Sequence, residues 1–393
     1  MVGASVDFRQ EARARRVTPE VSRSFFPATC HTGLTRRELL LAGGAAILLA
    51  EPLVRAGREA LAGTSDDGAG IVQRYATPLD DPWIVAHGVR AMGRSFTLGT
   101  GRRAVDYLLE SVLVDVPANG KIFLGFPIDV EGHPNMFLKT MLEATVPVDY
   151  AFTHKGRRRT VQEVVDGARA LLRSSQVASS PNELPWSLIA LTRTTPVSRR
   201  QWTNAWGEST DLDALVESAL RLLEQASSPI AEAMREGRPE TQQAPVHNFT
   251  CGGCHMIYAL LAALQAGYTG KDRSRRMQQQ VDLLVWRLSA DLDLIDRFYR
   301  ARGNSVTDFW YQFDAKLKLL GHAEECLAFA ELHKLARFTS AQRTQRQAAT
   351  ATLRRLLFDL DARNLGEAKA LDRDLYRQLV GDTCHARHGL TLA

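Results

Sequence analysis

The sequence predicts an all-α protein, and three observations support this prediction. Apolar residues recur at helical spacing through most of residues 79–380, several of these segments open with capping residues, and only one short segment has the pattern of a strand. That strand is expected at 122–126, and a single strand cannot form a sheet. We therefore expect the chain to fold as packed helices.

The first helix of the folded body is expected to start at Asp80-Asp81-Pro82-Trp83 and to run through Met92. The two carboxylates stand where a helix is capped, Pro82 suits the first turn, and apolar residues follow at helical spacing. Capping boxes, in which Thr and a Glu or Gln three residues later satisfy the same helix start, stand at 160–163 and 339–342. Periodicity predicts the other helices at 101–113, 135–144, 159–174, 185–193, 211–225, 252–268, 273–300, 314–337, 339–361 and 364–380.

The composition is typical of a globular protein with a sizeable core. The chain has 393 residues, of which 45% are hydrophobic, 24% are charged and five are cysteine. These values exclude a disordered, collagen-like or disulfide-dense chain. The formal net charge is +5, but residues 1–62 carry nine basic and six acidic side chains and so supply +3 of it. Because the rest of the chain is nearly neutral, we expect no nucleic-acid partner.

Residues 1–62 resemble a twin-arginine (Tat) export signal. A long basic segment leads to Arg36-Arg37, and a twelve-residue apolar run follows at 39–50. Twelve residues are too few for a membrane span, which takes about 20. An A-x-A cleavage pattern follows at 60–62. The resemblance implies the Tat export machinery as a partner, and a periplasmic or extracellular location with no stable membrane span after cleavage. An uncleaved anchor and an ordinary buried helix are the alternatives.

The rest of the chain divides into a linker and one domain. Residues 63–78 begin with small and polar residues and are expected to be a linker. Residues 79–393 are expected to form a single all-helical domain.

Weak repetition runs through the expected helices. Three of them carry a histidine in an apolar run, at His87, His255 and His322, and the segment around Trp186 has the same texture without a histidine. Longer, more polar helices follow some of these, as 273–300 follows the helix of His255. Alternating apolar inner and amphipathic outer helices predict a helical repeat that closes on itself.

This pattern resembles the α/α toroid of terpenoid cyclases, prenyltransferase β-subunits and many glycan-active enzymes. More narrowly, the segments at 81–87, 251–255 and 319–322 look like those of a group of uncharacterised exported bacterial toroid proteins. The resemblance implies a toroid-like core at about 79–335, which leaves 336–393 as a helical C-terminal extension.

One motif of that fold is missing. The Asp-x-Asp-Asp sequence of triterpene cyclases does not occur, and the nearest match is Asp291, Asp293 and Asp296. This spacing spreads the carboxylates around a helix, so we expect them on a solvated outer face.

Cys251-Gly252-Gly253-Cys254-His255 matches the attachment pattern of a covalent c-type haem. The two thiols can reach the two vinyl groups and His255 can bind the iron. The sixth ligand is Met277, His322 or His333, or is missing, and spacing does not choose among these. One hypothesis is therefore a monohaem protein for electron transfer or sensing. The alternatives are thiol or metal chemistry at a helix N-terminus, or glycines that allow close packing beside small buried thiols.

The histidines of the apolar runs form a second candidate site. In a toroid the N-terminal ends of the inner helices converge, so His87, His255 and His322 would meet at one mouth, with Asp81, Trp83 and Trp186 beside them. Such a cluster can hold zinc with an open position or act in acid–base chemistry. Candidate catalytic residues are thus His255, His322 and His87, and candidate metal ligands are His255 and His322. Three separate core histidines are the alternative.

Two further groups carry weaker signals. Cys326 lies four residues after His322 on the same helical face, whereas we expect Glu325 to face solvent or to pair with a lysine. Cys384, His385 and His388 are expected in a short C-terminal tail, where they are weak evidence for zinc and where Cys384 could instead form a disulfide.

The sequence leaves three classes of function open. The first is an exported toroid-like protein that binds or processes a small-molecule or glycan-like ligand in a central cavity lined by His and Trp. The second is the c-type monohaem protein, and the third is a non-catalytic binding or scaffold module. No substrate is identified by the sequence.

Overall fold

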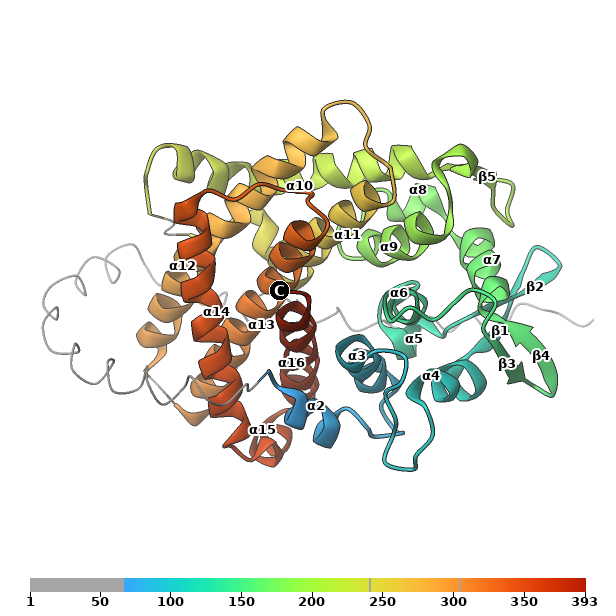
Figure 1. The fold of residues 1–393 in the computed structure, drawn as a ribbon, viewed down its shortest axis with the longest axis horizontal. Coiled ribbons are helices and arrows are strands. Elements are labelled where there is room, and N and C mark those ends of the chain that lie inside the picture. The colour runs from blue at the N-terminus through green and yellow to red at the C-terminus, as the bar shows by residue number, and fades with distance from the viewer. Residues whose placement is uncertain (1–66, 240–241, 304) are drawn as a thin grey trace, which may run out of the picture.

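The computed structural model describes residues 67–239, 242–303 and 305–393 and is mostly α-helical (Figure 1). The expected export signal and the first residues of the expected linker lie outside the described residues. Later in the linker segment the structure differs from the expectation, because Ala69–Tyr75 form helix α2. Ile71 and Val72 of α2 are buried, and the helix packs against α16 (Arg373–Leu392). Within the described ranges, no helix has both the length and the apolar character that a membrane span requires.

Six helices pack against one another in a closed order, which we call the inner ring. Each helix contacts the next and the last contacts the first. In Figure 1 they surround the centre of the view. The ring consists, in order, of α3 (Pro82–Met92), α6 (Met136–Glu143), α9 (Leu184–Thr194), α11 (Cys254–Gln265), α13 (Val306–Leu332) and α16.

Other helices pack on the outside of the inner ring (Figure 1). Helices α7 and α10 contact α9, α12 contacts α11 and α13, and α14 contacts α13. These outer elements are α4 (Ala104–Tyr107) with the π-helical turn η2 (Leu108–Val112), α7 (Val161–Leu171), α10 (Leu212–Arg235), α12 (Arg273–Arg302) and α14 (Ser340–Asp361). Shorter elements complete the helical part: α5 (Ile128–Glu131), α8 (Ser174–Val177), α15 (Leu365–Leu371), η3 (Val197–Arg199), η4 (Pro245–Asn248) and η5 (Thr250–Gly253).

The described chain also contains three antiparallel hairpins, so the protein is mostly α rather than entirely α. The expected strand is present as β2 (Lys121–Gly125), but it pairs with β1 (Val114–Ala118), which the sequence analysis missed. The missed strand contains a proline and follows a helix directly, which hides its pattern. The other hairpins are β3 (Ala151–His154) with β4 (Arg157–Thr160), and β5 (Gln201–Thr203) with β6 (Ser209–Asp211).

The C-terminal part of the chain differs most from the expectation. The helix expected at 364–380 is two helices, because Asp372 ends α15 and its side chain caps α16 by accepting bonds from two backbone N–H groups. Helix α16 continues to Leu392, packs along α13 and α3, and closes the inner ring. The expected extension at 336–393 is therefore partly wrong, since its last helix belongs to the centre of the fold.

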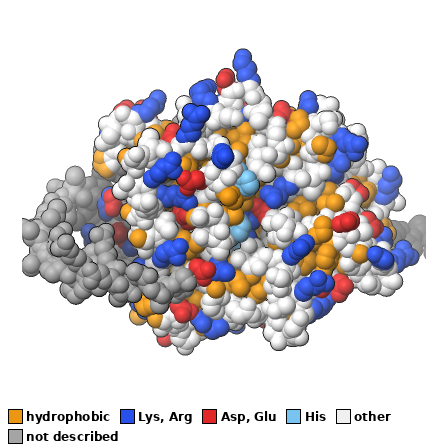
Figure 2. Space-filling view, viewed as in Figure 1, with side chains coloured by type: hydrophobic (Ala, Val, Ile, Leu, Met, Phe, Trp, Pro, Cys, Tyr) orange, Lys and Arg blue, Asp and Glu red, His pale blue; other side chains and the backbone are white. Residues whose placement is uncertain are grey.

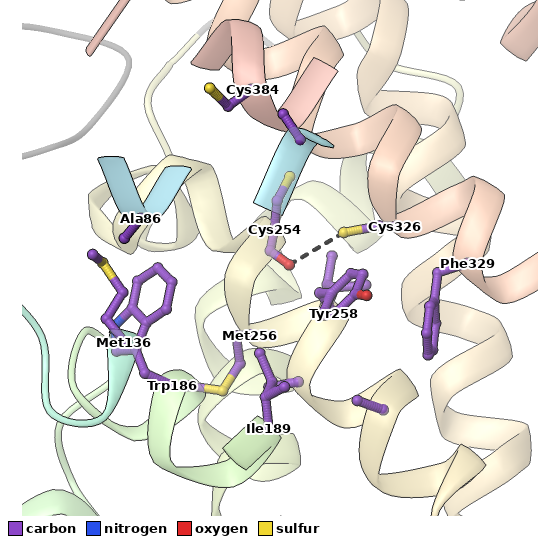
Figure 3. Close-up of a cluster of buried hydrophobic side chains, with 14 of the residues drawn as sticks. Ala86, Met136, Trp186, Ile189, Cys254, Met256, Tyr258, Cys326, Phe329 and Cys384 are labelled. Carbon is purple, nitrogen blue, oxygen red and sulfur yellow. Dashed lines mark hydrogen bonds between the residues drawn. The ribbon is translucent and has the colours of Figure 1, made fainter. Parts of the chain in front are cut away.

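Helices α13 and α16 approach closely because glycines lie between them. A Cβ added to Gly389 would lie 2.6 Å from the backbone nitrogen of Glu325, and one added to Gly321 would lie 3.1 Å from the carbonyl oxygen of Asp382. Side chains at these positions would push the two helices apart. Elsewhere the ring is filled by apolar side chains, among them Trp186, Met256, Tyr258 and Phe329 (Figure 3).

Candidate functional site

Every helix of the inner ring sends a polar or aromatic side chain toward a common buried centre. Each of these side chains is at most 8% exposed, and the Lys139 ammonium lies 5.5 Å from the ring centre of Trp186. They are His87 from α3, Lys139 from α6, Trp186 from α9, His255 from α11, His322 from α13 and His385 from α16. Viewed from the side of Figure 1, the surface has histidine side chains near its middle, among hydrophobic and charged ones (Figure 2).

Four of these residues form what we call the histidine cluster: His87, His255, His322 and His385. The ring centres of His322 and His385 lie 3.9 Å apart, and that of His255 lies 4.6 Å from His322 and 5.1 Å from His385. His87 is 5.3 Å from His385. The structure thus brings together the three histidines named from the sequence. It adds His385, which we expected in a short C-terminal tail.

The positions of these histidines along their helices differ from the expectation. Only His255 lies at the start of its helix, whereas His322 lies near the middle of α13. The residues meet because α3 packs against α16, and α13 packs against both α11 and α16, not because the starts of the helices converge.

Three imidazoles of the histidine cluster are held by one nitrogen each. Nδ1 of His87 donates to the carbonyl oxygen of Trp83 at 2.7 Å, and Nε2 of His322 donates to Asp382 Oδ1 at 3.0 Å. Nδ1 of His385 donates to Glu325 Oε2 at 2.9 Å. In the described part of the chain, the other nitrogen of each ring, and both nitrogens of His255, have no hydrogen-bond partner. Histidines that bind metals are oriented in this way, by a carboxylate or carbonyl at the nitrogen that does not bind.

Burial keeps three rings of the cluster in the form that can bind a metal. Desolvation lowers the pKa of His87 to about 3, and it holds the pKa values of His255 and His385 well below their usual range. These three rings are therefore neutral at physiological pH and keep a lone pair on one nitrogen.

Candidate ligand atoms lie close together in two overlapping groups. In one group, the ligand atoms of Cys251, His255 and His322 all lie within 4.8 Å of one another, and in the other so do those of His322, Glu325 and His385. His322 belongs to both groups. Because both oxygens of Glu325 already accept hydrogen bonds, we assign that carboxylate an orienting role rather than a ligand role.

Glu325 is buried at the centre of this arrangement, contrary to the expectation that it faces solvent or a lysine. Its carboxylate accepts from Arg90 at 2.6 Å, from His385, and from His388 at 2.7 Å. Burial disfavours the charged carboxylate, but Arg90 and His385 outweigh this and hold the pKa of Glu325 well below its usual range. Arg90 also pairs with the buried Glu143. Glu143, Arg90 and Glu325 thus form a buried charged network that orients His385.

A second buried network supports His322. Asp382, which accepts from His322, lies 3.8 Å from the Lys318 ammonium, and Lys318 donates to Asp314 at 2.9 Å. Burial raises the pKa of Asp314 to about 7. The network fixes the Asp382 carboxylate, and this carboxylate fixes the ring of His322.

Two aromatic side chains complete the walls of the cluster. The ring of Trp186 lies 4.1 Å from His255, and that of Trp83 lies 3.8 Å from His87, so both tryptophans named from the sequence are present. Asp81 is not part of the cluster, because it caps α3 and pairs with Arg377 at 2.8 Å.

The Cys-Gly-Gly-Cys-His motif forms a tight turn at the start of α11. Cys251, Gly252 and Gly253 all adopt left-handed backbone angles, with φ values of 51°, 61° and 85°. A Cβ on Gly253 would lie 2.7 Å from a methyl group of Val246. The glycines are therefore required for the turn and its packing, which agrees with the packing alternative.

The thiols of the described chain are buried and unbridged. Cys326 donates from Sγ to the carbonyl oxygen of Cys254 at 3.2 Å, as the dashed line in Figure 3 marks, and so does not join the histidine cluster. Burial raises the pKa of Cys326 and of Cys384, which makes both unreactive.

The motif residues as folded do not fit a covalent haem. Cys251 and Cys254 are 6% and 1% exposed, and the ring of His255 is surrounded by Trp186, His322 and His385. Of the other ligands considered for a haem, Met277 lies in the core of α12 and His333 is exposed at the end of α13. A haem at this motif would require α11 to separate from its neighbours in the ring.

The acidic residues near 291–296 also differ from the expectation. Asp293 is exposed, but Asp291 is 1% exposed and pairs with Arg287 at 2.8 Å and His247 at 3.2 Å. Arg287 in turn donates to the carbonyl oxygen of Gly252, so Asp291 stabilises the turn at the cysteine motif rather than a solvated face.

The sequence analysis missed the roles of His385 and His388. Their spacing of three residues places them on one face of a helix, and that face contacts Glu325. The three-residue spacing of these histidines could have been recognised in the segment 384–388. It was not recognised because helical periodicity fades after residue 380, where buried polar residues replace apolar ones.

Comparison with known proteins adds no assignment. The chain matches no protein-family model, no curated protein and no solved structure.

Proposed function

We propose that this protein is a metalloenzyme of the α/α-toroid type. The rings of His255, His322 and His385, whose centres lie 3.9 to 5.1 Å apart, would turn to bind one zinc ion and leave an open position for water or substrate. The closed order of the six inner helices supports the toroid interpretation. The proposal rests chiefly on one observation: His322 and His385 are each anchored by a buried carboxylate at one nitrogen, while the opposite nitrogen has no partner in the described chain.

The ligand type favours zinc. Neutral imidazoles suit zinc, and three protein ligands with a free fourth position are typical of catalytic rather than structural zinc sites. If the protein itself fills the fourth position in place of water or substrate, Cys251 is the candidate ligand, because its sulfur lies near His255 and His322. When bound, zinc at such a site activates water or polarises a carbonyl or phosphoryl oxygen of the substrate.

The chain supplies a route for protons. His388 is half-buried beside the cluster and donates from Nδ1 to the same carboxylate that orients His385. A histidine between the buried cluster and solvent can carry a proton in either direction. The ring centre of His87 lies 5.3 Å from that of His385, and its Nε2 has no hydrogen-bond partner among the described residues, so His87 is the candidate acid–base residue. The substrate class would be a small molecule or glycan-like ligand that reaches the centre of the ring.

Metal analysis of the purified full chain tests this proposal. We expect about one zinc per chain in the wild type, and less than about a tenth of that in His255→Ala, His322→Ala and His385→Ala. Cobalt substitution should give the absorption of a tetrahedral site, which serves as a readout independent of activity. His333→Ala is the matched control, because His333 follows the last residue of α13 and is exposed.

Two results would contradict the proposal. One is a folded wild-type chain that stays metal-free after incubation with zinc. The other is full metal content in the His255 and His385 variants, judged on samples whose circular dichroism matches the wild type. Retention of zinc in Cys251→Ser would support the open fourth position.

We also propose that the twin-arginine segment exports the chain after folding, so that the metal is loaded before export. Fractionation of cells tests this: wild type should reach the periplasm, whereas a variant with Arg36→Lys and Arg37→Lys should stay inside. Export of the variant at the wild-type level would contradict the signal assignment.

A further inference from the structure

A second candidate site lies away from the histidine cluster, in a cleft of about 570 Å³. The hairpin β1–β2 forms one wall, α7 and α8 form another, and the segment from Phe126 to Leu138 forms the floor. The size is within the range of about 300–1,000 Å³ found for small-molecule sites.

The body of the cleft is apolar. Its lining is mostly aliphatic and aromatic, with Val116, Leu124, Phe126, Leu138, Val164 and Leu171 as its main members. The one buried acid, Glu131, directs its two oxygens to the backbone N–H groups of Asn135 and Phe137 at 3.0 and 3.2 Å. Asn135 donates its side-chain amide to Ser187. These polar groups satisfy one another, so a ligand body gains most by being a hydrocarbon.

The mouth of the cleft carries a cation without an acidic partner. Arg173 is exposed, its guanidinium lies 4.9 Å from the ring centre of Trp206, and within the described residues it forms no salt bridge. Trp206 is itself 41% exposed, and the neighbouring Ile128 is 55% exposed. An amphipathic ring beside a free guanidinium is suited to the junction between a hydrocarbon chain and an anionic head group.

We infer that this cleft binds a single-chain amphiphile with a carboxylate head, with its chain along the apolar wall between β1–β2 and α7 and its carboxylate on Arg173. The site shares no residue with the histidine cluster and does not depend on the metal. The exposed Asp129 on the rim disfavours an anion weakly, and it therefore provides a useful control.

Calorimetric titration of the full chain with dodecanoate, dodecanol and dodecyltrimethylammonium tests the inference. We expect saturable 1:1 binding of dodecanoate, weaker binding of dodecanol, and the weakest binding of the cationic amphiphile. Arg173→Gln should weaken dodecanoate about five- to tenfold, because a partly exposed charged pair is lost, and should change dodecanol less than about twofold.

Matched variants locate the site. Arg169→Gln is the control for Arg173, since Arg169 stacks on Trp202 at 4.9 Å and does not line the cleft. Asp129→Asn should leave dodecanoate binding unchanged or strengthen it. Ala168→Leu should weaken dodecanoate and dodecanol alike by filling the cleft. Trp206→Ala should also weaken both by removing an aromatic wall of the cleft, and because Trp206 is exposed this change does not disturb the core.

Absence of saturable dodecanoate binding by the folded wild type would overturn the inference. Equal affinities for the anionic and cationic amphiphiles, or no effect of Arg173→Gln, would overturn the assignment of the head group. The zinc content of each variant is measured in parallel, so that loss of amphiphile binding with normal zinc, or the reverse, separates this inference from the proposed function.

Discussion

His385 and Glu325 form a buried contact between α16 and α13, with Nδ1 of the histidine 2.9 Å from Oε2 of the carboxylate. Sixty residues separate them in the chain. The same carboxylate accepts from Arg90 of α3 and from His388. One side chain thus joins three helices of the inner ring and orients a candidate ligand.

Glu325→Gln should weaken metal binding and destabilise the fold. An amide cannot balance the charge of buried Arg90, so we expect a loss of about 3 kcal/mol in the free energy of unfolding. Loss of the orienting carboxylate should lower zinc affinity about 10- to 100-fold. Urea unfolding and competition with a zinc chelator measure the two effects. Glu367→Gln, at an exposed position on α15, is the control, and an equal response of both variants would argue against this role of Glu325.

The metal-free protein should lose stability as the pH falls from 6.5 toward 4.5. Burial lowers the pKa of His87 to about 3 and also lowers those of His255, His385 and His388. Between these values and the usual 6.5, the unfolded chain binds more protons than the folded chain, so acid favours unfolding by up to about 1.4 kcal/mol per pH unit for each histidine.

Two buried carboxyl groups oppose this trend. Burial raises the pKa of Glu131 to about 8 and that of Asp314 to about 7, so each stabilises the fold as the pH falls toward 4.5. Four histidines outnumber two carboxyl groups, and the net effect should remain destabilising. Urea midpoints at pH 7.5, 6.5, 5.5 and 4.5 measure it, and His87→Gln should flatten the profile. A stability that is constant or rises over this range would contradict the burial of neutral histidines.

Gly389→Ala should destabilise the protein even though alanine favours helices. The intrinsic gain is about 1 kcal/mol, but the new Cβ would lie 2.6 Å from the Glu325 nitrogen, and backbone cannot move aside cheaply. We expect a net loss of about 2 kcal/mol or more, together with reduced zinc content. Gly99→Ala, where no atom lies within 4 Å of the added Cβ, should change the thermal midpoint little.

The four described cysteines should resist labelling in the native state. All are buried, and burial raises the pKa of Cys326 and Cys384. Peptide mapping after iodoacetamide treatment should find these four thiols unmodified in buffer and modified in urea. Rapid native labelling of Cys251 or Cys254 would show that the turn before α11 opens, which would revive the reactive-thiol hypothesis.

A covalent haem should be absent from the protein even when it is produced with cytochrome maturation machinery. The thiols of the motif are enclosed, and the ring of His255 is packed among three other rings. A red preparation with a Soret band and a positive covalent haem stain would contradict this expectation.

Much of the helical framework was predictable, and its errors have local causes. The strongly periodic helices at 185–193 and 339–361 agree with α9 and α14 to within one residue at either end. The start of α13 was set too late because Val306 to Phe313 mixes apolar and polar residues without a clear stripe. Helix α16 was cut short because its buried face carries Asp382, His385 and small residues in place of a leucine stripe.

The candidate site was predicted in part. His87, His255 and His322 stood out as histidines in apolar runs, and the structure brings them together. His385 and Glu325 did not stand out, because charged and polar residues are expected at the surface unless they are paired. Their pairing joins positions that are far apart in the sequence, and spacing within one helix cannot reveal it.

The sequence by itself determined that the chain is mostly helical, where most helices lie, and that His87, His255 and His322 lie in apolar runs. These properties follow from local periodicity and capping, which act within about a turn or two of helix. Only the tertiary structure decided that α16 closes the inner ring, that Glu325 and Asp382 orient His385 and His322, and that the cysteine motif is enclosed. Those outcomes depend on buried charges finding partners across the ring, a condition set by packing between distant segments.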